Sequence, residues 1–166
     1  MSDSAYTLFE QQQADRGINV EQVKIRLKAL KVETPSWGYG DSGTRFKVFK
    51  QVGVPRNPFE KLDDAAQVYR FTGLSSSVAL HIPWDKVDDY AKLQDHAASQ
   101  GLTIGAINPN LFQEDDYIFG SVCNSQTAIR RKATNHILEC VEIARILGSS
   151  LISLWFADGT NYPGQA

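Results

Sequence analysis

The chain has 166 residues and a formal net charge of −2; 42% of its residues are hydrophobic and 22% are charged. This length suits one domain with a sizeable core, and the lack of a basic surplus argues against a nucleic-acid partner. No run of about 18 apolar residues is present, so we expect no membrane partner. The first residues do not resemble a signal peptide, and two cysteines, Cys123 and Cys140, are too few for a disulfide framework. We therefore expect a cytoplasmic protein.

Two helices are expected at the start of the chain. Residues 4–16 are helical in composition, and residues 19–31 place apolar side chains at helical spacing behind Asn19, which is a good N-cap. We interpret residues 1–31 as an N-terminal helical extension.

Strand-like and helix-like segments then alternate to the last residues of the chain. Each strand-like run is short and rich in β-branched or aliphatic residues, and each helix-like run ends at or near a glycine. The expected elements are a strand at 32–37, a glycine-rich loop at 38–43, an extended segment at 44–49, a helix at 58–73, a strand at 77–82, a helix at 85–100, a strand at 102–107, a loop at 108–124, a helix at 125–147 and a strand at 150–156.

This alternation predicts an α/β fold with a parallel sheet, because parallel strands need long crossover connections. An open doubly wound sheet and a closed (β/α)₈ TIM barrel both satisfy the pattern. The first βα turn lacks the features of a mononucleotide fold, so we favour the N-terminal half of a barrel with about four parallel strands and outer helices. In this interpretation residues 32–166 are the first four β/α units of a single partial domain. Half a barrel exposes sheet edges, so we expect this segment alone to be marginally stable or self-associating.

Residues 38–43 match G-x-G-x-x-G letter for letter. That motif binds a pyrophosphate only where a strand precedes it and a helix begins within it, because the helix N-terminus faces the phosphates. Here residues 44–49 alternate polar and apolar side chains, which indicates extended backbone. We interpret 38–43 as a surface loop.

His81 is the sharpest candidate for chemistry in this chain. It stands at the end of a predicted strand, directly before a proline and Trp84, where a barrel opens toward its substrate. We interpret His81 as a catalytic residue that bonds a substrate hydroxyl or moves a proton, in preference to a core histidine that bonds a backbone carbonyl. Asp85 is close enough in sequence to pair with His81, but we assign it to the N-cap of the next helix.

Three aromatic residues stand at or just beyond strand ends: Trp37, Phe112 and Trp155. Aromatic rings contact the apolar C–H faces of sugars and exclude water at the mouth of a cavity. Any one of them alone fits ordinary core packing, but three at equivalent places, with His81 and Trp84 between them, indicate a pocket wall.

Amides and a carboxylate near the strand ends leave two readings open. Asn108 and Asn110 suit hydroxyl contacts or the turn around Pro109, and Asp158 suits a turn or a pocket carboxylate.

A divalent-metal site needs three or four convergent carboxylates and imidazoles. The strand ends offer only His81 and Asp158, while His96 and His136 fall on predicted helices. We interpret the acidic run at 114–116 as a solvated face, and we assign no metal ligand within this chain.

Several strings of the sequence resemble the bacterial L-rhamnose isomerase-like sugar isomerases, which belong to the xylose-isomerase-like TIM barrels. The resemblance runs from about residue 15 to residue 166. The strings that carry it are Pro35-Ser36-Trp37-Gly38, Gly43-Thr44-Arg45-Phe46, Lys61-Leu62-Asp63-Asp64, Leu80-His81-Ile82-Pro83-Trp84-Asp85-Lys86, Glu139-Cys140-Val141-Glu142-Ile143 and Asp158-Gly159-Thr160-Asn161-Tyr162-Pro163-Gly164-Gln165.

The resemblance implies an aldose–ketose isomerase, an intramolecular oxidoreductase that uses two divalent ions, typically Mn²⁺, and forms a homotetramer. It implies that Trp37, His81, Phe112 and Trp155 line the sugar site, with His81 handling the ring oxygen when the cyclic sugar opens. It implies that Phe46 reaches the pocket of a neighbouring subunit. The metal ligands of such enzymes come from later strands, so this chain is expected to supply the sugar-contacting half of the site.

Two alternatives to an isomerase stay open at the level of sequence. A non-catalytic sugar-binding or interaction module would use the same aromatic wall. A metal-dependent epimerase or endonuclease would use the same type of barrel.

Overall fold

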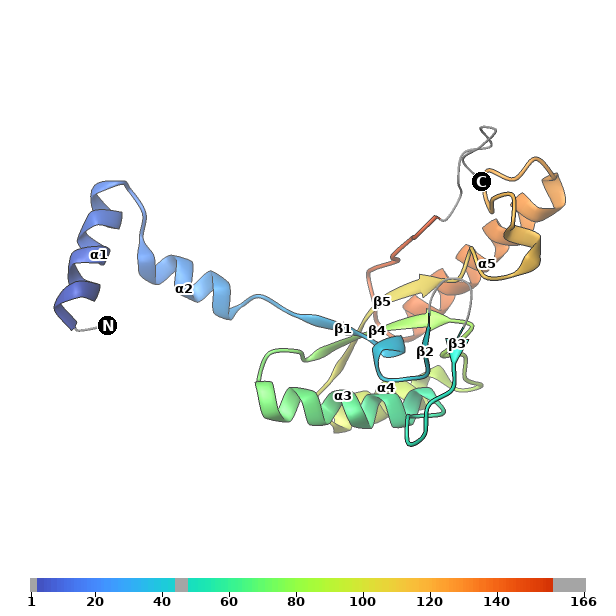
Figure 1. Ribbon diagram of the computed structural model, residues 1–166, viewed down its shortest axis with the longest axis horizontal. Coiled ribbons are helices and arrows are strands. Elements are labelled where there is room, and N and C mark those ends of the chain that lie inside the picture. The colour runs from blue at the N-terminus through green and yellow to red at the C-terminus, as the bar shows by residue number, and fades with distance from the viewer. Residues whose placement is uncertain (1–2, 44–47, 157–166) are drawn as a thin grey trace. The chain divides into compact units, whose positions relative to one another are not determined.

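The computed structural model of the protein describes residues 3–43 and 48–156 (Figure 1). The chain divides into two compact units, Met1–Lys31 and Val32–Ala166. No helix in the described residues is both long enough and apolar enough to cross a membrane.

The first unit consists of two helices, α1 at Asp3–Asp15 and α2 at Val20–Lys28. The Asn19 side chain accepts a hydrogen bond from the backbone N–H of Gln22 at 2.9 Å, so the predicted N-cap is confirmed. No residue of α2 is buried, although its sequence carries apolar side chains at helical spacing.

A parallel three-stranded sheet forms the centre of the second unit (Figure 1). Its strands are β1 at Glu33–Pro35, β4 at Ser77–Ile82 and β5 at Thr103–Pro109, in the spatial order β1-β4-β5. Because the strands are parallel, their carboxyl ends meet at one edge of the sheet. The α/β class with parallel strands is therefore confirmed, and the arrangement is consistent with part of an α/β barrel.

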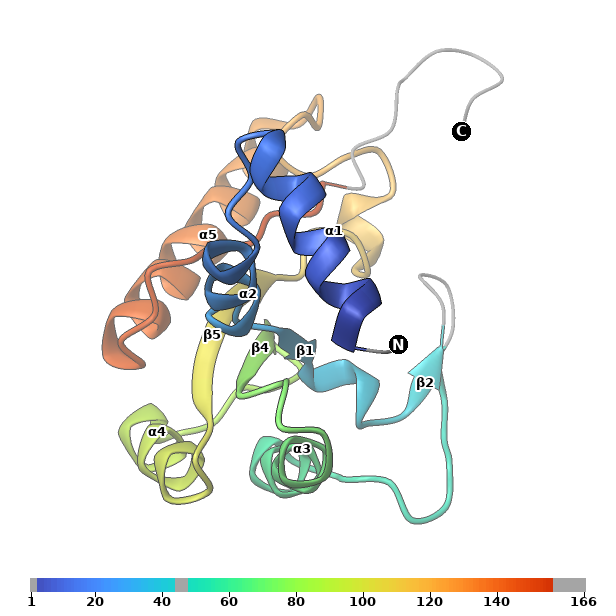
Figure 2. The same ribbon diagram turned by 90° about the vertical axis from the view of Figure 1, so that its left-hand side faces the viewer.

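Three helices connect and cover the strands: α3 at Pro58–Thr72, α4 at Tyr90–Ser99 and α5 at Thr127–Ile146. In Figure 2, α3 and α4 lie side by side, and α5 runs next to β5. Helix α3 is stopped by Gly73, whose φ of 68° is in the left-handed region.

The predicted helix at 85–100 begins five residues later than expected. Its N-cap is Asp89, which accepts a hydrogen bond from the backbone N–H of Lys92 at 3.0 Å. The assignment of Asp85 to the N-cap is therefore wrong, and its actual role is described with the site.

The predicted strand at 150–156 is reduced to a single parallel bridge. Ile152 pairs with Ile107, and the backbone N–H of Ile107 donates to the carbonyl of Leu151 at 3.0 Å. The fourth strand position is thus next to β5, but no ladder extends from it within the described residues. Of the extended segment predicted at 44–49, residues 44–47 lie outside the described residues, and Val48–Phe49 form β3, which pairs with β2 at Ser42–Gly43.

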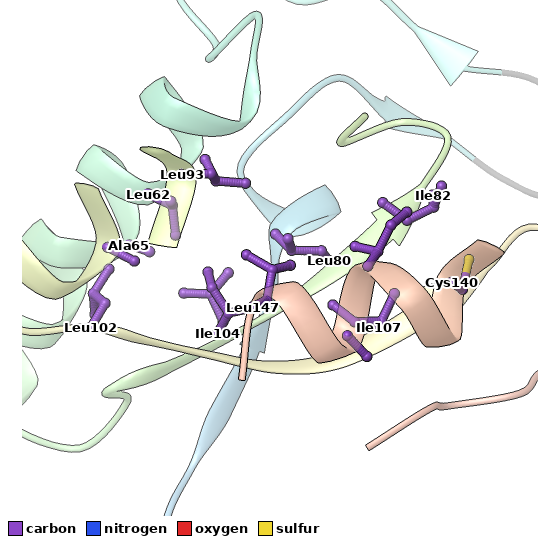
Figure 3. Close-up of a cluster of buried hydrophobic side chains, with 14 of the residues drawn as sticks. Leu62, Ala65, Leu80, Ile82, Leu93, Leu102, Ile104, Ile107, Cys140 and Leu147 are labelled. Atoms are coloured by element: carbon purple, nitrogen blue, oxygen red, sulfur yellow. The ribbon is translucent and has the colours of Figure 1, made fainter. Parts of the chain in front are cut away.

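The hydrophobic core lies between the sheet and the helices (Figure 3). Successive side chains of a strand point to opposite faces, so Val78, Leu80 and Ile82 share one face of β4, and Ala79 and His81 share the other. Leu80 and Ile82 pack in the core and are fully buried. The helices contribute Leu62, Ala65, Leu93, Cys140 and Leu147. Burial of these side chains positions His81 on the face that points away from the helices.

The Glu33 carboxylate connects the three strands near their amino ends. Glu33 Oε2 accepts hydrogen bonds from the Ser77 hydroxyl at 3.0 Å and from the backbone N–H of Ala106 at 2.9 Å. The ladder between β4 and β5 shifts register here, and the Glu33 carboxylate satisfies an N–H of the irregular stretch. A Cβ on Gly105 would overlap this carboxylate and approach the Ser77 hydroxyl oxygen to 2.5 Å, so any larger residue would displace the Glu33 side chain.

We predict that Gly105→Ala destabilises the protein by about 2–4 kcal/mol, because the added methyl must displace the carboxylate that serves the Ala106 N–H. The matched control is Gly38→Ala, whose new Cβ would meet only Pro35 Cγ at an ordinary 3.5 Å. Denaturant unfolding of both variants measures the difference. The double variant Glu33→Ala/Gly105→Ala should cost less than the sum of the two single changes. Additive costs would contradict the clash.

Candidate functional site

The four residues predicted to line a pocket, Trp37, His81, Phe112 and Trp155, lie around one cavity of about 1350 Å³. They come from different parts of the sequence: the turn after β1, the end of β4, the loop after β5, and the segment after Ile152. The carboxyl ends of parallel strands meet at one edge, so the chain reaches this edge at the end of each strand. Trp84 also lines the cavity.

The rings form a continuous aromatic wall, defined here as Trp37, His81, Trp84, Phe112 and Trp155. The imidazole of His81 stacks on Trp84, with ring centroids 3.9 Å apart and planes at 19°. Trp37 meets His81 edge-on at 5.3 Å, and Phe112 meets it at 5.9 Å. Trp155 extends the wall through an edge contact with Phe112 at 4.7 Å. Such offset and edge-on contacts are favourable between aromatic rings and make the wall stiff.

His81 sits at the centre of this wall and is 6% exposed. Burial lowers the pKa of His81 to about 4 from 6.5, because a charged imidazolium loses its hydration there. Asp85 raises this pKa, whereas His136 and Lys61 lower it. The ring is therefore neutral near pH 7, and one of its nitrogens is a donor and the other an acceptor. Nδ1 is buried and has no hydrogen-bond partner within the described residues.

Asp85 is the fully buried acceptor that organises the turn after β4. Its Oδ2 accepts hydrogen bonds from the backbone N–H of His81 at 2.7 Å and from the Ser36 hydroxyl, and its Oδ1 accepts one from Lys61 Nζ at 2.6 Å. The backbone N–H of Asp85 donates in turn to the His81 carbonyl at 2.8 Å. Asp85 thus contacts the backbone of His81 and leaves its imidazole free to face the cavity. Sequence reasoning missed this role, because a helix start within the next few residues made the cap the simpler interpretation.

Lys61 is 8% exposed and reaches the site from α3. Its side chain lies against Gly40 in the glycine-rich loop, where a Cβ would approach Lys61 Cε to 3.2 Å. Part of the G-x-G-x-x-G match therefore has a packing reason, since Gly40 leaves room for a buried lysine. Lys61 was not among the predicted site residues, and lysine within a helical pattern is normally exposed.

The loop after β5 is held by amide side chains. Asn110 Oδ1 accepts hydrogen bonds from the backbone N–H groups of Phe112 and Gln113 at 3.3 and 3.0 Å. Gln113 Oε1 accepts from Trp84 Nε1 at 2.9 Å. Asn108 Nδ2 donates to the Leu80 carbonyl at 2.9 Å. Asn110 thus forms the turn that follows Pro109 and, with Gln113, helps to hold Phe112 and Trp84, whereas Asn108 connects β5 to β4.

The carbonyl of Ile82, next to His81, accepts two hydrogen bonds. The backbone N–H of Asn110 donates to it at 2.8 Å, and His136 Nε2 on α5 lies 3.1 Å from it. His136 is also 3.1 Å from Glu139, which bonds Lys86 at 2.6 Å. The end of β4 is therefore held by the residue after β5 and by α5 as well as by Asp85.

The lining of the cavity also includes charged side chains. Arg56 lies 3.9 Å from Glu60, and Asp63 accepts from His96 at 2.8 Å. The charged lining residues are Asp41, Lys50, Arg56, Glu60, Lys61, Asp63 and Asp64. A cavity lined by both aromatic and charged side chains suits a ligand that has both C–H faces and hydroxyl groups.

The described residues do not fit a divalent-cation centre. In residues 3–43 and 48–156, no group of three or more His, Cys, Asp or Glu side chains is placed to hold a metal. In the acidic run at 114–116, Glu114 and Asp116 instead bond Lys132 at 2.6 and 2.7 Å. Phe46 and Asp158, the remaining candidates, lie outside the described residues.

We predict that protein stability falls as the pH drops from about 6.5 to about 4, in part through His81. The unfolded chain takes up a proton on this residue near 6.5 and the folded chain only near pH 4, so the folded state loses up to about 3 kcal/mol over this window. Urea unfolding of the wild type and His81→Gln over this pH range isolates the contribution, because glutamine does not titrate. An equal pH dependence in both proteins would contradict the depressed pKa.

No family model matches the chain. Two curated proteins are similar to it over most of its length. A protein named probable sugar isomerase from Rhizobium meliloti is 45% identical over 158 residues, which are 92% of this chain and 37% of that protein. A second protein with the name probable sugar isomerase, from Mesorhizobium japonicum, is 41% identical over 155 residues, which are 90% of this chain and 36% of that protein. The chain thus spans little more than a third of the length of these relatives.

Proposed function

We propose that this chain supplies the sugar-contacting part of a sugar isomerase, an enzyme that interconverts an aldose and a ketose of the L-rhamnose/L-rhamnulose type. The observation that carries the proposal is the neutral His81 at the centre of an aromatic wall, at the carboxyl ends of parallel strands. The two relatives named probable sugar isomerase support it from sequence.

The aromatic wall would bind the sugar through its C–H face. Trp37, Phe112 and Trp155 line the cavity, and the stacking of apolar C–H groups on aromatic rings is favourable while it excludes water. The charged residues of the lining, which include Asp63 and Arg56, would remain for the hydroxyl groups.

His81 would act on the oxygen atoms at C1 and in the ring. Opening a cyclic sugar removes the proton of the anomeric hydroxyl and adds a proton to the ring oxygen. A neutral imidazole has one N–H and one lone pair, so it can serve either transfer without first losing a proton to water. Because Nδ1 is buried, the other ring nitrogen, Nε2, would make the contact with the sugar.

The isomerisation itself is internally balanced. The C2 carbon is oxidised from alcohol to ketone and the C1 carbon is reduced from aldehyde to alcohol, so no external oxidant or reductant is needed. In this proposal a divalent cation such as Mn²⁺ is bound by groups outside the described residues, since those residues do not fit such a site. The proposal also includes a homotetrameric assembly, which rests on the sequence resemblance.

The test is aldose–ketose conversion by the natural full-length protein, with L-rhamnose as the first substrate and Mn²⁺ supplied. We expect L-rhamnulose or another matching ketose to form. Sugar binding without conversion would favour a non-catalytic binding module. Neither binding nor conversion with any aldose would overturn the proposal.

We predict that His81→Gln lowers kcat by about 100-fold or more, because the amide bonds hydroxyl groups but transfers no proton. His96→Gln is the matched control. His96 lies on α4 and bonds Asp63, and Asp63 keeps a second hydrogen bond, from Gln100 Nε2 at 3.1 Å, when the histidine is replaced. We expect His96→Gln to change kcat by less than about threefold. Equal kcat values for the wild type and His81→Gln would remove His81 from the chemistry.

We predict that Trp155→Ala raises KM about tenfold, through loss of a ring that contacts the sugar, and that Trp155→Phe raises it less. Phe156→Ala is the control, because Phe156 is the adjacent aromatic residue, is 43% exposed and does not line the cavity. Steady-state kinetics of the three variants measures the effect. A similar KM for Trp155→Ala and Phe156→Ala would exclude Trp155 from the sugar site.

A further inference from the structure

The buried carboxylate of Asp85 connects two residues of the aromatic wall that belong to different strands. It accepts the backbone N–H of His81 at 2.7 Å, and it accepts the hydroxyl of Ser36, the residue directly before Trp37. Trp37 and His81 meet edge-on at 5.3 Å. One side chain thus bonds the backbone of one of these two residues and the chain neighbour of the other.

Lys61 supplies the positive charge that compensates the buried carboxylate of Asp85. A carboxylate that is fully buried needs a cation or several donors, and Asp85 has Lys61 Nζ at 2.6 Å in addition to the two donors just named. Three donors on two oxygens leave Asp85 little capacity to bond a ligand. Its contribution is therefore to hold other groups in place.

Stability alone does not account for a buried ion pair at this position. Replacing such a pair by apolar side chains of similar volume is often neutral or stabilising, because both charges lose their hydration. Elsewhere in the same unit the core is built from aliphatic side chains. The pair lies where the wall of the cavity is assembled, which favours a role in geometry.

We propose that Asp85 is a positioning residue of the sugar site, which fixes Trp37 and His81 relative to each other, with Lys61 as its counterion. This inference rests on the proposed function for its substrate, a sugar, and goes beyond it in assigning a positioning role to Asp85, Lys61 and Ser36, of which Lys61 also lines the cavity.

The ion pair also sets the electrostatic environment of His81. The charged or titratable groups that act on the His81 ring are Asp85 from its own turn, Lys61 from α3 and His136 from α5. Asp85 favours the protonated ring, whereas Lys61 and His136 disfavour it. Removing one member of the pair therefore leaves the field of the other uncompensated.

The first test is the pKa of His81, measured by NMR titration of its ring protons in the full-length protein. Lys61→Met should raise this pKa and Asp85→Asn should lower it. If the pair only maintained the fold, both changes would loosen the site, admit water and raise the pKa toward its ordinary value. Shifts in the same direction would therefore overturn the proposal. Asp89→Asn is the control, since Asn also caps a helix well.

The second test changes the support of Trp37 without changing that of His81, and it keeps the charges of Asp85 and Lys61. Ser36→Ala removes the hydroxyl next to Trp37 and leaves the bond from Asp85 to the His81 N–H intact. We expect KM for the sugar to rise about fivefold while kcat stays within about twofold, because binding at the Trp37 side is loosened and the histidine is still held. Ser77→Ala is the matched control: Ser77 is also buried and bonds a carboxylate, Glu33, at the opposite end of the strands.

The outcomes distinguish the positioning role from the proposed function. If the wild type isomerises an aldose and Ser36→Ala, Asp85→Asn and Ser77→Ala are all as active as the wild type, the positioning role is overturned and the function stands. If the wild type neither binds nor converts a sugar while the two pKa shifts have opposite signs, the function is overturned and the electrostatic coupling of Asp85 and Lys61 to His81 stands. A Ser36→Ala variant with unchanged KM would remove Trp37 from the role.

Discussion

The three hydrogen bonds accepted by the buried carboxylate of Asp85 are the constraint on which the candidate site depends. They join the turn after β1, the end of β4 and helix α3 at one point. The fold brings the carboxyl ends of the strands to one edge, but it does not by itself decide how side chains on separate strands meet. The Asp85 carboxylate fixes how they meet, because the loss of any of its donors would leave part of a buried negative charge without a hydrogen bond.

The same turn is held from two further directions. The Ile82 carbonyl is bonded by the residue after β5 and lies close to His136 on α5, and Gln113 bonds the indole N–H of Trp84. His81 is therefore surrounded by fixed backbone and stacked on Trp84, while its Nδ1 has no hydrogen-bond partner in the described residues. A site that holds a neutral imidazole in this way is organised in advance, so little freedom remains to be lost when a substrate binds.

Hydrophobic spacing and glycine positions were enough to predict the α/β alternation, the strand at 77–82 to the residue, and the stop of α3 at Gly73. They also placed Trp37, His81, Phe112 and Trp155 at strand ends, where the structure brings them together. The spacing could not reveal Asp85 or Lys61, because a buried ion pair across 24 residues of sequence follows from tertiary packing. The late start of α4 also follows from tertiary packing. The Asp85 side chain bonds Ser36, Lys61 and His81, and Asp89 caps the helix instead. The strand-like spacing at 150–156 likewise could not show that the pairing with β5 is a single bridge in the described residues.

The central claim is that the aromatic wall around His81 is the surface that receives a sugar. The most direct measurement is a crystal structure of the natural full-length protein with L-rhamnose bound. We expect the C–H face of the sugar to lie against Trp37, Phe112 or Trp155, an oxygen of its C1 end or ring to be within hydrogen-bond distance of the His81 ring, and Asp85 to remain bonded to the His81 N–H. A sugar bound elsewhere, or one that leaves the His81 ring untouched, would contradict the account.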